Sequence, residues 1–340
     1  MVTKSTGIIS TVAGTPRVRG YSGDDGPALS AKLYNPTGVA IDISGNIYIA
    51  DTANNLLRMV TKSTGIISRV AGTPNKYGSS GDGGPALSAR LYFPTGIALD
   101  ASGNIYIADY YNEVIRMVTK STGIISRVAG TVGVSGYSGD GGPALLAKLF
   151  NPKGIALDVS GNIYIADYFN SVIRMVTKST GIISTVAGTV GSILPPKNGG
   201  YSGDGGPAVS AKLLIPSGMA VDLSGNIYIA DTGNGIIRMV TKSNGIISTV
   251  AGIPSKHGNS GDGGPATSAL LNNPLKVIAT NNGTFYIADS YGNTIRTFTV
   301  APSATPVVVS SATPVVRHDT SSLLCHPLSW IMISLIFVVW

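Results

Sequence analysis

Short runs of alternating apolar and polar residues recur along the chain, separated by glycine-rich turns. In residues 96–118 the run GIALD precedes the turn ASGN, the alternating run IYIAD and the run VIRMV. A further run, GIISRVAG, follows the turn TKST. Runs rich in β-branched and aromatic residues between such turns predict antiparallel strands. We therefore predict four strands in this stretch, and a short helical turn in PALSAKL, where proline suits the first helical position.

The same pattern returns five times. The string MVTKSTGIIS begins at residues 1, 59, 117 and 175, and MVTKSNGIIS begins at residue 239. The run IYIAD, or FYIAD in the last unit, ends at residues 51, 109, 167, 231 and 289, so the steps are 58, 58, 64 and 58 residues. The longer step reflects an insert around residues 192–199. Five units therefore occupy residues 1–300, which we predict to form one domain.

Four strands repeated every 40 to 60 residues or so predict an all-β fold, a β-propeller of four-stranded antiparallel blades. We name the strands of a blade a to d from the axis outward, and we expect a short helical turn in each d–a loop. The repeat count predicts five blades, or six if translation starts upstream of Met1. Residues 7–14 precede the first complete blade, and the last blade has no such strand after it. We therefore expect residues 7–14 to form the outer strand of the last blade and to close the ring.

A family resemblance follows from these motifs. The pattern P-x-G-[VIM]-A-[ILV]-D, followed by G-N-I-Y-I-A-D-x-x-N-x-x-I-R, resembles the NHL repeat, and GIISTVAG with GDGGPA-x-x-A-x-L resembles its teneurin-type variant. The resemblance implies a β-propeller, usually of six blades, of a type found in many large extracellular proteins. The last unit departs from the pattern, because Thr280 replaces a repeated aspartate and Gly292 replaces a repeated asparagine.

Two sets of charged residues recur once in each unit. The functional hypothesis is that the aspartates form a ring of carboxylates, such as a calcium site on the channel. The structural hypothesis, which we favour, is that each aspartate accepts hydrogen bonds inside its own blade, because a buried charge must be paired. The aspartates are Asp51, Asp109, Asp167, Asp231 and Asp289, and the arginines that could pair with them are Arg58, Arg116, Arg174, Arg238 and Arg296.

Composition narrows the chemistry. Hydrophobic residues make up 43% of the chain and charged residues 12%, which excludes a disordered chain. The single cysteine, Cys325, excludes a disulfide scaffold and a cysteine-based zinc site. The three histidines, His257, His318 and His326, do not supply the zinc ligands that the resemblance to NHL-type lyases would require. We therefore expect no enzyme, no cofactor and no metal, and we keep an NHL-type lyase or lactonase as a weak alternative.

The loops between strands b and c carry aromatic residues, next to variable segments of the d–a loops at residues 17–21, 75–80 and 192–201. Aromatic side chains on such loops suit contacts with a protein or a glycan. The alternative is that one ring of each pair covers the neighbouring blade. The candidate ligand-binding residues are Tyr110, Tyr111, Tyr168, Phe169 and Tyr291.

The net charge of +7 raises the question of an anionic partner. We expect the repeated lysines of the c–d turns to lie around the rim of the face opposite the aromatic loops; they are Lys62, Lys120, Lys178 and Lys242. Single-stranded RNA sites combine a basic groove with stacking aromatics. We therefore do not expect nucleic acid as a partner, and an intracellular propeller that binds RNA or protein is the alternative function.

The C-terminal segment indicates the cellular location of the protein. Residues 301–322 are rich in Pro, Ser, Thr and Val and predict an extended stalk, and residues 323–340 form an uncharged hydrophobic tail. A small-residue attachment site, a polar spacer and such a tail fit a GPI signal, with Ser310 as the candidate attachment residue. A single C-terminal membrane helix is the alternative, and no N-terminal signal peptide is present in this sequence. We expect a cell-surface adhesion, recognition or scaffold module, with Asn282 as a glycosylation sequon.

Overall fold

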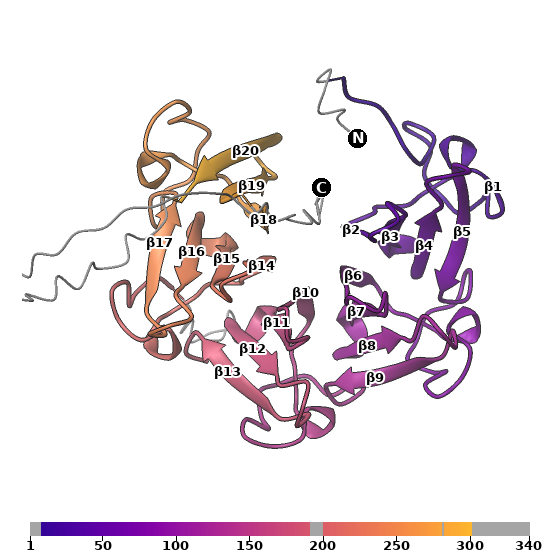
Figure 1. Ribbon diagram of the computed structural model, residues 1–340, viewed down its shortest axis with the longest axis horizontal. Coiled ribbons are helices and arrows are strands. Elements are labelled where there is room, and N and C mark those ends of the chain that lie inside the picture. The colour runs from indigo at the N-terminus through magenta and orange to yellow at the C-terminus, as the bar shows by residue number, and fades with distance from the viewer. Residues whose placement is uncertain (1–7, 191–199, 281, 301–340) are drawn as a thin grey trace, which may run out of the picture.

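The computed structural model describes residues 8–190, 200–280 and 282–300. It confirms an all-β, five-bladed propeller, in which the blades follow one another around a common axis (Figure 1). Each of the first four blades contains an antiparallel sheet with strands a to d, and the fifth contains strands a to c. In chain order the blades are β2–β5 (Gly38–Ile41, Ile47–Asp51, Leu56–Val60, Ile66–Ala71), β6–β9 (Pro94–Leu99, Ile105–Asp109, Val114–Val118, Ile125–Ala129), β10–β13 (Pro152–Leu157, Ile163–Asp167, Val172–Val176, Ile183–Ala187), β14–β17 (Met219–Val221, Ile227–Asp231, Ile236–Val240, Ile247–Ala251) and β18–β20 (Pro274–Ala279, Thr284–Asp289, Thr294–Thr299).

The expected helical turn in each d–a loop is present as a single 3-10 turn. These turns are η1 (Ala28–Ser30), η3 (Ala86–Ser88), η5 (Ala144–Leu146), η7 (Ala208–Ser210) and η9 (Ala266–Ser268). Just before each of the first four of them, the loop backbone also pairs with the outer strand of the same blade; in the first blade this segment is β1 (Gly26–Pro27), beside β5. The outer strand of a complete blade therefore lies between strand c and the d–a loop, with backbone pairing on both sides.

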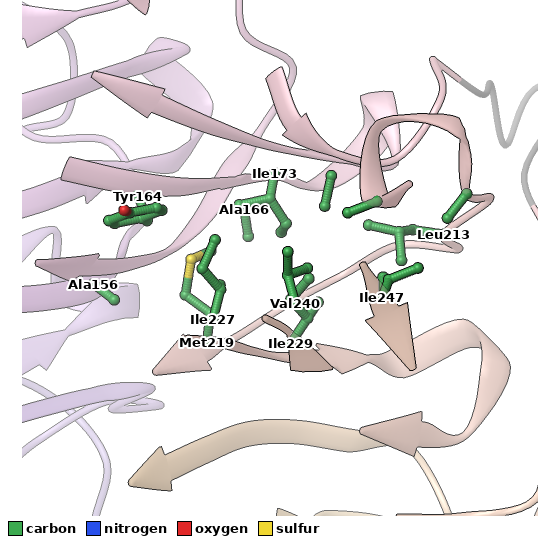
Figure 2. Packing of buried hydrophobic residues seen from close by; sticks show 13 residues of the cluster. Ala156, Tyr164, Ala166, Ile173, Leu213, Met219, Ile227, Ile229, Val240 and Ile247 are labelled. Atoms are coloured by element: carbon green, nitrogen blue, oxygen red, sulfur yellow. The ribbon is translucent and has the colours of Figure 1, made fainter. Parts of the chain in front are cut away.

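Apolar side chains fill the space between neighbouring blades. Between the third and fourth blades, Tyr164 and Ile173 pack against Met219, Ile229 and Val240 (Figure 2). All five are at most 5% exposed. Because each of the second, third and fourth blades faces a neighbour on either side, apolar side chains lie on both faces of its strands, and burial of this surface supplies the main stabilisation.

Glycine at one position of strand a allows neighbouring blades to meet near the axis. A Cβ atom on Gly38, Gly96, Gly154 or Gly218 would lie 2.0, 2.5, 2.3 or 2.5 Å from a carbonyl oxygen in, or just before, the next blade's inner strand. Any side chain there would push the blades apart. In the fifth blade this position is Lys276, so its inner strand cannot meet a further blade in the same way.

The predicted closure of the ring by residues 7–14 is wrong for residues 8–14, the part of that segment which the structure describes. The described sheet of the fifth blade consists of β18, β19 and β20, so residues 8–14 do not form one of its strands. Figure 1 shows an opening between β20 and the first blade. The N–H groups of Gly14 and Thr15 donate instead to Ala28 and Ala31 of the first blade, at 2.8 and 2.9 Å. The C-terminal end of this segment is therefore held on the first blade, across the opening from β20.

Candidate functional site

The loops between strands b and c are built alike in the first four blades. Each forms a 3-10 turn: η2 (Thr52–Asn54), η4 (Tyr110–Asn112), η6 (Tyr168–Asn170) or η8 (Thr232–Asn234). In η4 the side chain of Asn112 points inward and donates to Asp109 Oδ2 at 2.8 Å and to the Gly78 carbonyl at 2.6 Å. This anchor leaves the first two positions of the turn for variable side chains. In the second and third blades those positions are aromatic.

Aromatic rings from the second and third blades join into one array, which we call the aromatic surface. Neighbouring ring centroids are 4.8 to 6.4 Å apart along this array, which suits aromatic contact. Tyr111 and Tyr77 are the most exposed members, at 47% and 62%. The members are Tyr77, Tyr92, Phe93, Tyr110, Tyr111, Phe150, Tyr168 and Phe169.

The structure brings four of the five sequence-predicted ligand residues together on this surface, namely Tyr110, Tyr111, Tyr168 and Phe169. Tyr291 is 71% exposed and lies in the β19–β20 loop, and no described ring contact joins it to the array. Burial raises the pKa of Tyr168, and the Tyr291 phenol adds to this rise.

Sequence reasoning did not single out the other four rings. Tyr92 and Phe93 directly precede the inner strand of the second blade, and Phe150 holds the place of Tyr92 in the third blade. Tyr77 lies in the d–a segment 75–80, whose variability was the available signal. Comparing these positions between repeats could have found them, because Tyr34 stands at the same place in the first blade and Leu214 in the fourth.

Lys153 adds a positive charge beside the rings. Its Nζ atom lies 4.5 Å from the centre of the Tyr168 ring, within the range of a cation–π contact. Burial lowers the pKa of Lys153. The equivalent positions in the other blades hold Thr37, Thr95, Ser217 and Leu275, so this lysine is particular to the third blade.

Glu113 directly follows the aromatic turn η4 and links the second and third blades. It ends η4 with a left-handed backbone (φ 63°), is 8% exposed, and accepts a hydrogen bond from the Asn151 N–H. Burial raises the pKa of Glu113 to about 7. Asn55 makes the equivalent contact one blade earlier, where its Oδ1 accepts from the Phe93 N–H at 2.8 Å. In the first three blades, the side chain of the residue that follows the b–c turn therefore ties one blade to the next.

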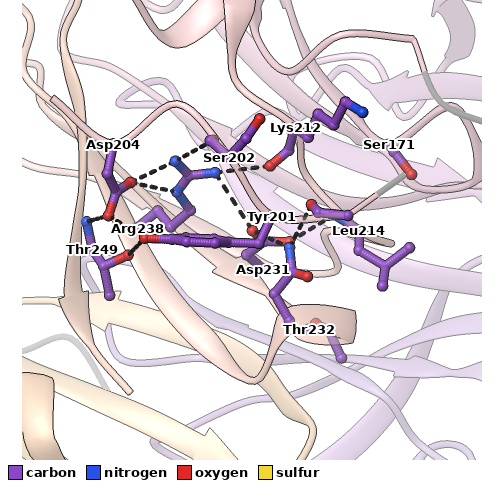
Figure 3. A network of polar contacts seen from close by, with 12 residues as sticks. Ser171, Tyr201, Ser202, Asp204, Lys212, Leu214, Asp231, Thr232, Arg238 and Thr249 are labelled. Carbon is purple, nitrogen blue, oxygen red and sulfur yellow. Dashed lines mark hydrogen bonds and ion pairs between the residues drawn. The ribbon is translucent and has the colours of Figure 1, made fainter. Parts of the chain in front are cut away.

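The repeated charges form a network inside each blade, shown for the fourth blade in Figure 3. Arg238 is fully buried, and its Nη2 lies 2.5 Å from Asp204 Oδ1 while its Nη1 lies 3.8 Å from Asp231 Oδ2. Asp231 also accepts from the Leu214 N–H and from the Asn234 amide, both at 2.8 Å. Burial raises the pKa of Asp231 to about 7, whereas these hydrogen bonds and Arg238 lower it.

The other blades repeat this arrangement. Each repeated arginine lies 2.5 to 2.7 Å from one aspartate and 3.5 to 3.8 Å from a second aspartate, which is fully buried. Every repeated aspartate is therefore engaged within its own blade rather than turned toward a shared ion. The pairs with the buried aspartates are Arg58–Asp51, Arg116–Asp109, Arg174–Asp167, Arg238–Asp231 and Arg296–Asp289.

The remaining candidate residues lie elsewhere. Asn282 is exposed in the turn between β18 and β19, where its Oδ1 accepts from the Thr284 N–H at 3.2 Å. Ser310, the stalk and the hydrophobic tail lie outside the described residues. Within the residues described, His, Cys, Asp and Glu side chains form no group of three or more that could hold a metal ion. That same part of the chain contains no helix with the length and apolar character needed to cross a membrane.

Solved structures similar to this chain have the same fold. An auxiliary nutrient binding protein from Bacteroides ovatus matches with a TM-score of 0.54 and 17% identity, over 79% of this chain and 60% of that one. A chain of the nidogen/laminin complex matches with a TM-score of 0.52 and 16% identity, over 79% of both chains. At these identities the likeness concerns the fold alone.

Sequence comparison is more specific. Mouse teneurin-3 is 33% identical over 244 residues, which are 67% of this chain and 9% of teneurin-3, and mouse teneurin-1 is 28% identical over 253 residues. The chain thus spans about a tenth of the length of these relatives. The model of the teneurin NHL domain matches residues 8–80, 71–137, 133–195 and 187–259. With the repeated motifs and the propeller on which they lie, these matches show that the chain belongs to the teneurin NHL-domain family.

Proposed function

We propose that this chain is a non-enzymatic binding module that presents its aromatic surface to a protein partner, as a part of cell-surface adhesion, recognition or scaffolding. The membership in the teneurin NHL-domain family supports a protein-binding role. A glycan is the other ligand that suits exposed tyrosines, and the experiment below distinguishes the two.

One observation carries this proposal. The aromatic surface gathers eight rings on the loop side of two adjacent blades, and Tyr77 and Tyr111 leave much of their area exposed. Contiguous exposed apolar surface on a soluble domain marks an interaction site more often than isolated apolar residues do. Tyrosine is also enriched at the energetic centres of protein interfaces.

The test is a binding screen of the full chain against an array of purified extracellular proteins and against a glycan array. We expect a protein ligand whose affinity falls at least tenfold or so when Tyr77 and Tyr111 are both replaced by Ala, because buried tyrosines at an interface centre each contribute strongly. Tyr34→Ala is the matched control, since Tyr34 occupies the equivalent of Tyr92 in the first blade, outside the aromatic surface.

Two results would count against the proposal. Unchanged affinity in the Tyr77→Ala/Tyr111→Ala variant, with the fold intact by circular dichroism, would remove the aromatic surface from the binding site. Ligands found on the glycan array alone, and lost in the same variant, would keep the surface but replace the protein partner by a sugar.

We also propose that the C-terminal tail anchors the chain at the cell surface, through a GPI group attached at Ser310. Treatment of intact source cells with phosphatidylinositol-specific phospholipase C should release the chain into the supernatant. Retention on membranes would favour a transmembrane helix instead. Recovery from the cytosol would contradict the surface address and would favour an intracellular partner, RNA included.

A further inference from the structure

Among the described residues, no strand pairs with the outer edge of the fifth blade. In the fourth blade, β17 lies between β16 and the d–a loop, and the loop exchanges backbone hydrogen bonds with it. The N–H groups of Gly205 and Ala208 donate to Ile247 and Gly245, both at 2.8 Å, and the Ile247 N–H donates to Gly206 at 3.0 Å. The same loop is present in the fifth blade, but no strand lies beside it in the described part of the chain.

The groups that would hold such a strand are in place. The counterparts of the fourth-blade loop groups are the Gly263 and Ala266 N–H groups and the Gly264 carbonyl, and none of them has a backbone partner among the described residues. On the opposite wall, the Thr241 N–H of the fourth blade donates outward to Ile246 at 2.9 Å. The counterpart of Thr241 in the fifth blade is Thr299. Because the backbone N–H groups of successive residues point to alternate sides of an antiparallel strand, Thr297 is the next residue of β20 whose N–H points outward.

A cavity of about 320 Å³ occupies this place. We call it the strand slot, and Gly263, Pro265, Ala266, Arg296, Thr297 and Phe298 are among the residues that line it.

Within the described ranges, the side chain of Asp262 lacks the backbone partner that its counterpart has in the fourth blade. In the fourth blade, Asp204 Oδ2 accepts a hydrogen bond from the Thr249 N–H of the outer strand at 2.8 Å, and the Asp204 side chain is 27% exposed. Asp262 is its counterpart, and its Oδ1 pairs with Arg296 Nη2 at 2.6 Å in the same way. The Asp262 side chain, however, is 80% exposed. Its second oxygen is positioned to receive the N–H of an incoming strand.

The chain's own segments fit the slot poorly. Residues 8–14 have the sequence of an outer strand, but Gly14 is bonded to the first blade, and Lys276 prevents the fifth blade from meeting another inner strand as the other blades do. In the 58-residue register of the sequence, Ser303 corresponds to the turn glycines that have φ of 67° or 68°. Pro306, which has no N–H, corresponds to Ser248, which pairs with Met239 in the fourth blade.

We propose that the strand slot binds an extended segment of another polypeptide, which completes the fifth blade by β-augmentation. The four complete blades define the chemistry of that segment, because each fills the same position with the pattern GIIS-x-VAG. Backbone hydrogen bonds on both sides would supply affinity, and the side-chain pattern would supply specificity. The strand slot is formed by the fifth blade, whereas the aromatic surface belongs to the second and third, so the two sites have no residue in common.

The test uses a labelled, end-capped octapeptide with the sequence of residues 181–188, GIISTVAG, titrated into the full chain. We expect saturable one-to-one binding. Ala266→Pro removes one N–H donor and should weaken binding by about tenfold, as the loss of one hydrogen bond does. Proline fits this position because Ala266 begins a 3-10 turn and Pro265 before it is already extended (φ −60°, ψ 133°). Ala266→Gly keeps the N–H and should bind the peptide as the unchanged chain does.

A second pair of variants probes the other wall. Thr297→Pro should abolish binding, whereas Thr297→Val, which keeps the N–H, should preserve it. Absence of peptide binding to the unchanged chain, or equal affinity in Ala266→Pro, would overturn the proposal. A concentration-dependent dimer in sedimentation velocity that excludes the peptide would assign the slot to a second copy of the chain and would overturn it as well.

Discussion

The repeats of this chain are nearly identical, so the blades differ mainly at a few substituted positions. Glu113, Asn55 and Ser171 occupy one position that follows the b–c turn, and the side chains of Asn55 and Ser171 are uncharged. Glu113 is the member that can ionise, and it is buried without a basic partner in a described ion pair or hydrogen bond. Its position at the junction of two blades therefore makes stability depend on pH.

Replacing Glu113 by Gln tests this dependence. Burial raises the pKa of Glu113 from 4.5 to about 7, so the folded state holds its proton more tightly than the unfolded chain does. The contribution of this carboxyl to stability is then complete below pH 4.5 and is lost as the pH rises to about 7. Glutamine keeps an oxygen acceptor for the Asn151 N–H and does not titrate.

The measurement is the free energy of unfolding of both chains, from urea titrations at pH 4.5 and at pH values above 7. Relative to the Gln variant, the unchanged chain should lose about 3 kcal/mol over this interval, at 1.36 kcal/mol per pKa unit. Asp109, Asp167 and Asp231 titrate in both chains, so their contributions cancel in the difference. An equal difference at both pH values would show that Glu113 is not held protonated by its burial.

At the scale of the strand, the position of a strand within its blade determines how many of its backbone N–H and C=O groups are hydrogen-bonded. The outer strands β5, β9, β13 and β17 pair on one side with strand c and on the other with the d–a loop. In the fifth blade the last strand is β20, which pairs with β19 alone among the described residues. Exposed strand edges carry unpaired backbone groups and are prone to join other strands.

Hydrogen exchange of the full chain reports this difference directly. The outward N–H of Thr297 should exchange faster than that of Met239, its counterpart in the fourth blade, by about a hundredfold or more, because an unbonded amide needs no opening of the fold. Addition of the GIISTVAG peptide should slow Thr297 and leave Met239 unchanged. Equal protection of the two amides in the chain alone would mean that the edge of β20 is already paired.

At the scale of the whole molecule, the propeller contains four similar interfaces between blades and two apolar faces at its opening. On the side of the fifth blade, Ile295 is 71% exposed and Tyr286 is 39% exposed. Their counterparts in the third blade, Ile173 and Tyr164, are 0% and 1% exposed. The candidate interaction surfaces of the propeller, namely the opening, the strand slot and the aromatic surface, therefore lie around the molecule rather than at its axis.

Much of this arrangement was predictable from local pattern. Alternating runs such as IYIAD, their glycine-marked turns and the 58-residue period determined the strands, the blades and their number, because each repeat specifies the same short-range pairing. The paired charges also follow from pattern, since a buried aspartate in every repeat needs a partner in every repeat. Tyr110, Tyr111, Tyr168 and Phe169 were identified as loop residues for the same reason.

Tertiary structure alone decided where the circle of blades ends and which aromatic side chains contact one another. Residues 8–14 carry the sequence of an outer strand, yet the position of the first blade, rather than that sequence, determines where they lie. Tyr77 and Tyr92 are 15 residues apart in the chain, and only the packing of the d–a loop brings their rings to 4.8 Å. Local sequence determines pairing between neighbours along the chain, whereas contacts between blades depend on the rotation accumulated from one blade to the next, which no single repeat encodes.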